Sequence, residues 1–342
     1  MYSKSTPIPT SKVLPAALRT KRGSESRHIY RNERKDDSMT KTEELAVLAE
    51  TLGCAVKRDE PLSAHTTFRI GGACDVMITP DSAEHLAQLV RFAKENAVRT
   101  LVLGKGSNML CDDKGFRGAV FLIDKPLGEI TVEGDRIRAG AGASLILVCM
   151  AALEEGLSGL EFAYGIPGTV GGGVYMNAGA YGGEMVDIVT SVTAMDRDGN
   201  LHTYPAGELG LGYRCSRFCG SDEIIISVEM KLTKSEKTAI EEKMDDLISR
   251  RREKQPLNFP SAGSTFKRPE GMFAGKLIED SGLRGYRIGG AQVSEKHCGF
   301  IVNTGGATCR DITELVEYVQ KIVLENTGVL LECEIKMIPC GE

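Results

Sequence analysis

Tryptophan is absent from this chain of 342 residues, and aromatic residues make up only 6% of it. No apolar run exceeds the nine residues from Leu145 to Leu153, which excludes a bilayer-spanning helix, because such a helix needs about 20. The ten cysteines include no C-x-x-C pair, and their wide scatter indicates reduced thiols of a cytoplasmic protein rather than a zinc ribbon. The five histidines form no H-E-x-x-H motif and no cluster at ligand spacing, so we expect no metal site.

The charge is unevenly distributed along a chain long enough for about two domains. Residues 1–38 carry a net charge of +5, whereas the rest carries −10, which argues against nucleic acid as the main partner. The first 38 residues have no apolar signal-peptide core, and their four acidic residues count against a transit peptide. We interpret them as a disordered tail, with Met39 as the biological start.

Hydrophobic periodicity predicts alternating helices and strands from residue 40 onward. We expect helices over 40–52, from 82 to beyond 93, and over 144–155, 234–253 and 311–326. We expect strands over 74–78, 100–103, 120–123, 130–139, 186–196, 224–232 and 329–338. These elements suggest two subdomains, about 40–110 and 111–233, and a further domain over 234–342.

Two glycine-rich loops are candidate anion-binding sites. Gly104-Lys105-Gly106-Ser107-Asn108 follows a predicted buried strand directly, and residues 165–183 contain eight glycines. Glycine permits positive φ and lets amide N–H groups converge on an anion such as a pyrophosphate. Neither loop completes G-x-G-x-x-G, and the Walker A motif and the G-x-S-x-G elbow are absent, which excludes Rossmann, P-loop and hydrolase interpretations. Two such loops favour binding of a dinucleotide.

Seven segments in order carry a resemblance to a known family. They are 65–72 (HTTFRIGG), 103–108 (LGKGSN), 159–162 (GLEF), 165–168 (GIPG) with 176–182 (MNAGAYG), 213–216 (YRCS), 261–269 (SAGSTFKRP) and 331–335 (LECEI). From about residue 41 to its end, the chain resembles the UDP-N-acetylenolpyruvoylglucosamine reductase (UDP-N-acetylmuramate dehydrogenase) family.

This resemblance implies an α+β fold: an FAD-binding domain of the PCMH (vanillyl-alcohol-oxidase-like) type with two subdomains, and a C-terminal α/β substrate domain. The implied enzyme is a cytoplasmic, monomeric oxidoreductase of peptidoglycan precursor synthesis that binds neither nucleic acid nor membrane. Non-covalently bound FAD would take hydride from NADPH and pass it to C3 of the enolpyruvyl group of a UDP-sugar. Protonation at C2 would then give UDP-N-acetylmuramate.

The resemblance also implies roles for individual residues. The catalytic residues would be Arg214, Ser264 and Glu334, and no metal would take part. The expected substrate contacts are Tyr213, Lys267 and Arg268. The expected FAD contacts are Gly104, Lys105, Gly106, Ser107, Asn108, Gly165, Pro167, Gly168, Asn177, Ala178 and Gly179.

The chemistry of the three catalytic candidates is consistent with these roles. Hydride addition next to a carboxylate leaves an enolate-like dianion, which needs a cation and a proton donor. The guanidinium of Arg214 can donate two parallel hydrogen bonds to the carboxylate. Ser264 lies among small residues, which let its hydroxyl approach a ligand. The pleat of a strand over 329–338 would place Glu334 opposite the apolar face. Arg214 and Ser264 are only 50 positions apart, which suggests the subtype without a substrate-capping loop.

Two alternatives remain at the level of sequence. One is a flavin oxidase of the same fold that uses O₂, although such oxidases often tether FAD through His or Cys, and the glycine-rich segment offers neither at an obvious position. The other is a non-catalytic nucleotide-binding protein. A yellow protein that NADPH bleaches without air would distinguish the reductase from the binding protein.

Overall fold

The computed structural model describes residues 39–341, so the predicted tail over residues 1–38 lies outside the described residues. All five predicted helices are present there, together with two short ones. The helices are α1 Lys41–Thr51, α2 Ala83–Glu95, α3 Leu145–Glu154, α4 Val170–Tyr175, α5 Lys237–Lys254, α6 Ala274–Asp280 and α7 Cys309–Thr327. In this part of the chain, no helix is long and apolar enough to cross a membrane.

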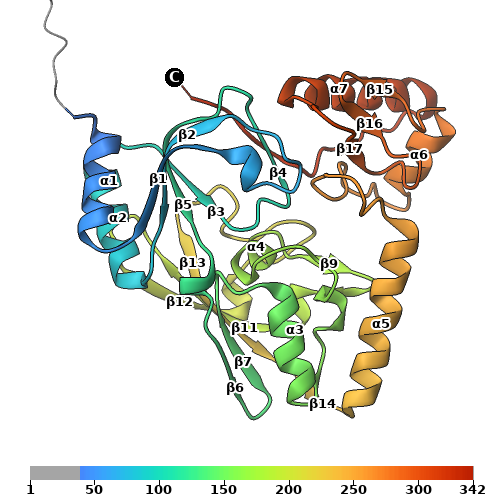
Figure 1. Cartoon of the computed structure of the whole chain (residues 1–342). Coiled ribbons are helices and arrows are strands. Elements are labelled where there is room, and N and C mark those ends of the chain that lie inside the picture. Colours follow the sequence, from blue (N-terminus) through green and yellow to red (C-terminus); the bar gives the residue numbers. More distant parts are fainter. Residues whose placement is uncertain (1–38, 342) are drawn as a thin grey trace, which may run out of the picture. The chain divides into compact units, whose positions relative to one another are not determined.

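The first sheet has four strands in the order β1-β2-β5-β3. β1 pairs antiparallel with β2, whereas β2 and β3 both run parallel to β5. Helices α1 and α2 lie side by side next to this sheet (Figure 1). Since β5 belongs to it, the sheet continues past the predicted subdomain boundary near residue 110. Its strands are β1 Ala55–Pro61, β2 Ala73–Thr79, β3 Thr100–Leu103 and β5 Phe116–Leu122.

The second sheet is antiparallel, with the order β12-β11-β13-β7-β6. The prediction of one strand over 130–139 is wrong, because Gly134 adopts φ +64° and turns the chain into a hairpin between β6 and β7. The predicted strand over 186–196 begins three residues late, since Met185–Asp187 form a 3-10 turn. Its strands are β6 Ile130–Glu133, β7 Arg136–Gly140, β11 Val189–Met195, β12 Leu201–Pro205 and β13 Ile224–Lys231.

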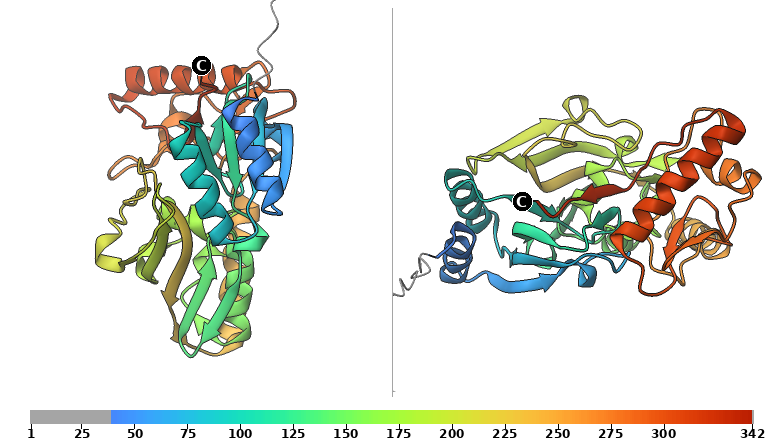
Figure 2. Two further views of the ribbon diagram at one scale, coloured as in Figure 1. Left: turned by 90° about the vertical axis from the view of Figure 1, so that its left-hand side faces the viewer. Right: turned by 90° about the horizontal axis from the view of Figure 1, so that it is seen from above.

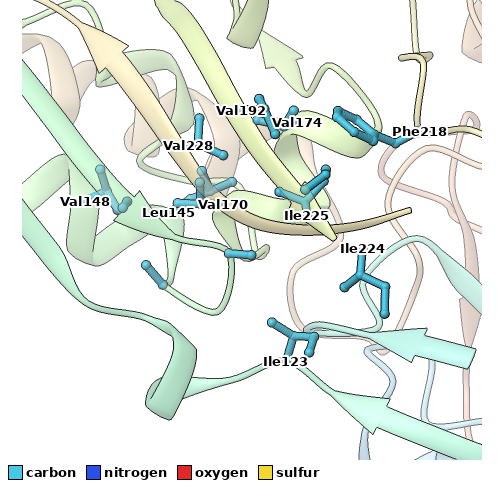
Figure 3. Close-up of a cluster of buried hydrophobic side chains, with 14 of the residues drawn as sticks. Ile123, Leu145, Val148, Val170, Val174, Val192, Phe218, Ile224, Ile225 and Val228 are labelled. Atoms are coloured by element: carbon cyan, nitrogen blue, oxygen red, sulfur yellow. The ribbon is translucent and has the colours of Figure 1, made fainter. Parts of the chain in front are cut away.

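Apolar side chains of α3 and α4 pack onto one face of the second sheet. Leu145 of α3, Val170 of α4 and Val228 of β13 are fully buried and lie close together (Figure 3). The same core includes Ile240 and Met244 of α5. This long helix therefore packs with the predicted FAD-binding domain, although the prediction assigned it to the C-terminal domain.

A separate core lies beyond α5, where α6 and α7 pack with a three-stranded sheet of the order β15-β16-β17 (Figure 2). Helix α7 begins at a capping box of Thr308 and Asp311 and ends at Gly328, whose φ is +74°. Phe68, Ile70 and Leu110 from the N-terminal half contribute to this core. The strands are β15 Arg287–Ile288, β16 Ala291–Val293 and β17 Ile301–Asn303.

The C-terminal segment returns from this core to the first half of the chain (Figure 1). The prediction of a strand over 329–338 is largely wrong, because only β18 (Lys336–Ile338) is regular, and it pairs in parallel with β4 (Met109–Cys111). Residues 329–335 lie against the loop around Thr265 instead of a strand. Cys333 in this segment makes an isolated β-bridge with Phe266. Two-residue strands complete the pairings: β9 Gly179–Ala180 with β10 Gly183–Glu184, and β8 Leu157–Ser158 with β14 Thr233–Lys234.

Candidate active site

Arg214 projects from a tight turn. Gly212 and Cys215 exchange two backbone hydrogen bonds of 3.1 and 3.2 Å, and Arg214 between them has φ +56°. This left-handed conformation is unusual for a residue with a side chain and is often found at functional sites. The hydroxyl of Ser216 donates to the Tyr175 carbonyl at 2.8 Å, which fastens the turn to the end of α4.

Arg214 forms an ion pair with Glu334, 120 residues further along the chain. Its Nε donates to Glu334 Oε1 at 2.8 Å, and its Nη2 donates to the Gly179 carbonyl at 3.1 Å. The two side chains are only 20% and 13% exposed. Within the described residues, Nη1 and the second hydrogen of Nη2 have no partner. They form a free fork suited to a carboxylate.

The backbone of Glu334 is held from two directions. Its N–H donates to the Thr265 carbonyl at 2.8 Å, and its carbonyl accepts a hydrogen bond of 3.2 Å from Asn108 Nδ2. Burial raises the pKa of the Glu334 carboxyl above the ordinary 4.5 and outweighs the opposite effect of Arg214. The predicted opposition of faces is present only in part: Leu331 and Ile335 are buried and Glu332 is exposed, but Glu334 is only 13% exposed and Met337 of the predicted apolar face is 46% exposed.

Ser264 is exposed, on a loop whose next residue, Thr265, is held by three hydrogen bonds. The buried Thr265 donates from its N–H to the Gly299 carbonyl at 2.8 Å, and its hydroxyl accepts from the Ile301 N–H at 2.9 Å. The Thr265 carbonyl also accepts a hydrogen bond from the Glu334 N–H. Ser264 is therefore the direct neighbour of a residue that contacts Glu334. The Ser264 hydroxyl has no hydrogen-bond partner within residues 39–341 and is free to meet a ligand.

The three predicted substrate contacts gather around the same loop. The Arg268 N–H donates to the Tyr213 hydroxyl at 3.0 Å, and Lys267 forms an ion pair with Glu332. The hydrogen bond to Glu332 raises the pKa of Lys267, so this side chain stays charged. Arg268 stacks over the ring of Phe273 at 3.9 Å. Three cations, including Arg214, therefore come from two loops that meet near Glu334.

The first glycine loop has the features of an anion cradle. No acceptor within the described part of the chain takes a hydrogen bond from the amide N–H groups of residues 105–108. Gly106 has φ +56°, and a Cβ there would lie 2.3 Å from the His65 carbonyl oxygen. Lys105 pairs with Asp124 at 2.9 Å. Free amides on a glycine-rich loop fit the pyrophosphate of a dinucleotide.

The second glycine loop adjoins the first. A Cβ on Gly104 would lie 2.7 Å from the Thr169 hydroxyl, and one on Gly168 would lie 4.0 Å from the Ser107 hydroxyl. The Gly168 carbonyl accepts from the N–H of Leu145, at the start of α3. Gly168 itself does not adopt a left-handed φ, so its backbone would tolerate other residues. The predicted loops thus form one surface, to which Pro167 also belongs.

The segment from Asn177 to Gly179, which we predicted to bind the cofactor, contacts both the Arg214 turn and residues 184–186. The buried Asn177 side chain donates to the Gly212 carbonyl and to Glu184, both at 2.9 Å, and accepts from the Val186 N–H at 2.9 Å. Its amide group is therefore occupied within the protein. Together with the Gly179 carbonyl, it positions the arginine turn, and Ala178 lies between them. The sequence held no signal for this role.

We expect Asn177→Ala to lower the free energy of unfolding, because the buried Asn177 side chain makes three hydrogen bonds and the Val186 N–H would lose its acceptor within residues 39–341. Each lost hydrogen bond costs about 0.5–1.5 kcal/mol. Urea unfolding followed by circular dichroism would measure the loss. Asn96→Ala is the control, since Asn96 makes a single side-chain bond to Phe92 at the end of α2. Equal stability of the two variants would contradict the positioning role.

One group of possible metal ligands occurs in the described chain, contrary to the expectation of no cluster. The ligand atoms of Cys54, Asp81 and His85 lie within 4.8 Å of one another, away from the residues above. His85 Nδ1 and Asp81 Oδ1 are hydrogen-bonded at 2.6 Å, and burial raises the pKa of the Cys54 thiol. The sequence did not reveal this group because Cys54 precedes a strand and His85 lies on α2.

Comparisons with known proteins identify the family of the chain. Residues 74–204 match the family described as FAD binding domain, and residues 255–338 match UDP-N-acetylenolpyruvoylglucosamine reductase, C-terminal domain. The UDP-N-acetylenolpyruvoylglucosamine reductase of Clostridium botulinum (strain ATCC 19397 / Type A) is 50% identical over 280 residues, 82% of this chain and 91% of the relative. That of Clostridium perfringens (strain SM101 / Type A) is 48% identical over 280 residues, with 82% and 92% covered. The crystal structure of the reductase from Thermus caldophilus aligns with TM-score 0.73 and 36% identity, and covers 84% of this chain and all of that one.

Proposed function

The chain belongs to the UDP-N-acetylenolpyruvoylglucosamine reductase family, and from this premise we propose that it reduces UDP-N-acetylglucosamine enolpyruvate to UDP-N-acetylmuramate with NADPH. We further propose that it acts in the cytoplasm as a monomer, in peptidoglycan precursor synthesis. The observation that carries the proposal is the Arg214–Glu334 pair. Within residues 39–341 the Nη1 of Arg214 has no partner, and the Glu334 backbone is held by Thr265, which follows Ser264, and by Asn108 of the first glycine loop.

The glycine loops would hold FAD without a covalent bond. The amides of residues 105–108 would donate to its pyrophosphate, and the loop over 165–168 would cover the adjoining part. Bound FAD supplies hydride transfer between NADPH and the enolpyruvyl group. Gly106 allows the close approach of backbone that this requires, since its left-handed φ and its contact with His65 leave no room for a side chain.

Arg214 would bind the carboxylate of the enolpyruvyl group through Nη1 and Nη2. The Nε bond to Glu334 and the Gly179 contact fix the direction of this fork. A fixed cation of this kind stabilises negative charge that develops on the substrate, because it needs no reorganisation during the reaction. Tyr213, Lys267 and Arg268 would contact the rest of the anionic nucleotide sugar.

Ser264 would hold the proton that goes to C2. The O–H bond of its hydroxyl breaks as the C–H bond at C2 forms. Because Ser264 is exposed, water can restore the proton afterwards. A hydroxyl is a weak acid, and it can act only on a strongly basic carbon, which hydride addition at C3 would create.

An anaerobic titration tests the proposed function. NADPH should bleach the flavin absorbance of the purified protein, and UDP-N-acetylglucosamine enolpyruvate should restore it with formation of UDP-N-acetylmuramate. Restoration of the absorbance by O₂ but not by the enolpyruvyl substrate would favour an oxidase. A colourless protein that still binds the UDP-sugar would favour a binding module.

We expect an acid limb in the pH profile of the substrate-dependent step, at a pH above 4.5. Glu334 is ionised above its raised pKa and pairs with Arg214, and the pairing is lost as the pH falls through that pKa. The rate of flavin oxidation by substrate should therefore fall with decreasing pH. Glu334→Gln should remove this limb and be slow at every pH.

Glu332→Gln is the matched control for this pH profile. Glu332 lies two residues earlier, and its side chain is 70% exposed. This variant should keep the acid limb at the same pH. A limb that persists in Glu334→Gln would assign the titration to another group.

A further inference from the structure

A cysteine, an aspartate and a histidine meet between α1 and α2, the helices that lie side by side in Figure 1. Antiparallel pairing sets Ala55, the first residue of β1, opposite Thr79, the last residue of β2. Cys54 and Asp81 flank this pair, so both lie at the same end of the two strands. His85 follows one helical turn after Asp81, and its Nδ1 lies 2.6 Å from Asp81 Oδ1. One potential ligand atom from each of the three side chains lies within 4.8 Å of the other two.

Hydrogen bonds fix the backbone around this group. Gly53 follows α1 with φ +86° and turns the chain, and the Cys54 N–H then bonds to the Ala49 carbonyl at 2.9 Å. Ser82 caps α2, since its hydroxyl accepts from the His85 N–H at 3.2 Å. A metal site needs ligands that are held near their binding geometry before the ion arrives. The helix end and the helix start provide such positions here.

One side of this group is open to solvent. The side chains of Asp81 and His85 are 49% and 31% exposed, and their ligand atoms lie within 4.8 Å of the sulfur of the buried Cys54. A cation can therefore reach the carboxylate and the imidazole from water, with the sulfur as the inner ligand. Burial raises the pKa of the Cys54 thiol, and a hydrogen bond from the Asp81 N–H partly opposes this effect. The same N–H would stabilise a thiolate bound to a metal ion.

The three ligand types together favour Zn²⁺. Thiolate and imidazole are zinc ligands, whereas Mg²⁺ and Ca²⁺ take oxygen ligands. Bond lengths of about 2.0–2.3 Å in a tetrahedral site put neighbouring ligand atoms about 3.3–3.6 Å apart, so shifts of about 1 Å from separations within 4.8 Å suffice. One thiolate and one carboxylate would balance the two charges of the ion, and a neutral complex can lie against an apolar core at little cost.

We propose that Cys54, Asp81 and His85 bind one Zn²⁺ ion through the sulfur, a carboxylate oxygen and an imidazole nitrogen, with water as the fourth ligand. The ion takes the place of the thiol proton, which is released to water. It ties the start of β1 to the start of α2 and stabilises the fold, because the ligands come together only in the folded chain. This inference goes beyond the proposed reductase chemistry, since it uses none of the residues assigned to FAD or substrate.

The first experiment titrates the full-length, untagged protein, kept reduced with a phosphine, with Co²⁺. Cobalt can occupy zinc sites, and its spectrum reports thiolate coordination in the near ultraviolet and tetrahedral geometry in the red, where oxidised flavin does not absorb. The wild type should bind one equivalent with both signals, and Zn²⁺ should displace it. Cys54→Ser and His85→Gln should weaken Zn²⁺ binding about a hundredfold or more, because the loss of an outer partner of a ligand already costs about 10–100-fold.

His202→Gln is the matched control. His202 Nε2 and Asp196 Oδ2 form a similar exposed pair at 2.7 Å, but within the described chain no cysteine joins it as a third ligand. This variant should bind the ion as the wild type does. In a second measurement, Zn²⁺ should raise the melting temperature of the wild type and of His202→Gln but not that of Asp81→Asn. Since Asp81 is exposed, Asp81→Asn tests the site even if Cys54→Ser does not fold.

Lack of a bound equivalent in the wild type would overturn the assignment, as would three other results. Co²⁺ binding with neither the thiolate nor the tetrahedral signal would exclude Cys54 as a ligand. Equal Zn²⁺ affinity of wild type and Cys54→Ser would indicate an adventitious ion only, held by other exposed groups. Displacement of Co²⁺ by Mg²⁺ as readily as by Zn²⁺ would indicate a site for a hard cation instead of zinc.

Discussion

The FAD of the Ser264→Ala variant is expected to accept hydride from NADPH at nearly the wild-type rate. It should pass the hydride to the enolpyruvyl substrate about 10²–10⁴ times more slowly than the FAD of the wild type. This is the usual cost of removing a positioned proton donor. Flavin reduction needs no proton at C2, so only the second half-reaction should suffer. Stopped-flow absorbance separates the two half-reactions.

The structure supplies a control for this experiment. Ser261 lies three residues earlier on the same loop, and within residues 39–341 its one hydrogen bond is from the Thr67 hydroxyl to its backbone carbonyl, at 2.6 Å. Ser261→Ala should behave as wild type in both half-reactions. Equal slowing of both half-reactions in Ser264→Ala would indicate that Ser264 positions a ligand, and no slowing would assign the proton to another group.

Gly106→Ala is expected to lower FAD affinity at least tenfold while the protein stays folded. The left-handed φ of +56° costs an L-residue about 1–2 kcal/mol, and the new Cβ would lie 2.3 Å from the His65 carbonyl oxygen and 2.9 Å from Thr66 Cα. Both neighbours are backbone atoms, so the loop itself must shift. Flavin absorbance per protein after gel filtration measures the loss.

Gly134→Ala is the control that isolates the clash. Gly134 has a similar φ of +64° in the hairpin between β6 and β7, and a Cβ there would meet nothing within 4 Å. This variant should lose some stability and keep its FAD. Full flavin occupancy in Gly106→Ala would show that the loop over 104–108 does not approach the cofactor.

The catalytic constellation could be predicted only in part from the sequence. Motif resemblance pointed to Arg214, Ser264 and Glu334, and the structure pairs two of them directly and places the third next to Thr265. Their roles remain predictions. Nothing in the sequence pointed to the positioning roles of Thr265 and Asn177, because both residues act through hydrogen bonds to segments that only the fold brings close. The Thr265 bonds to Gly299 and Ile301, for example, depend on the packing of the C-terminal core.

Apolar spacing and end residues were sufficient to predict helices α2 and α7. Helix α2 was predicted from its apolar spacing and Ser82, and its Leu86, Leu89 and Val90 are buried. Helix α7 likewise follows from its periodicity and from Gly328. In both, the start, the buried face and the end depend on residues within a few turns of one another, so the sequence by itself determined them.

Tertiary structure decided what depends on distant partners. Alternating side chains over 329–338 resemble a strand, yet only Lys336–Ile338 finds one to pair with, and the preceding residues bond to the loop around Thr265. The raised pKa of Glu334 comes from burial, which depends on how distant segments pack around it. Residue type and spacing determine which groups a segment offers. Chain packing determines which of them meet and how far water is excluded from them.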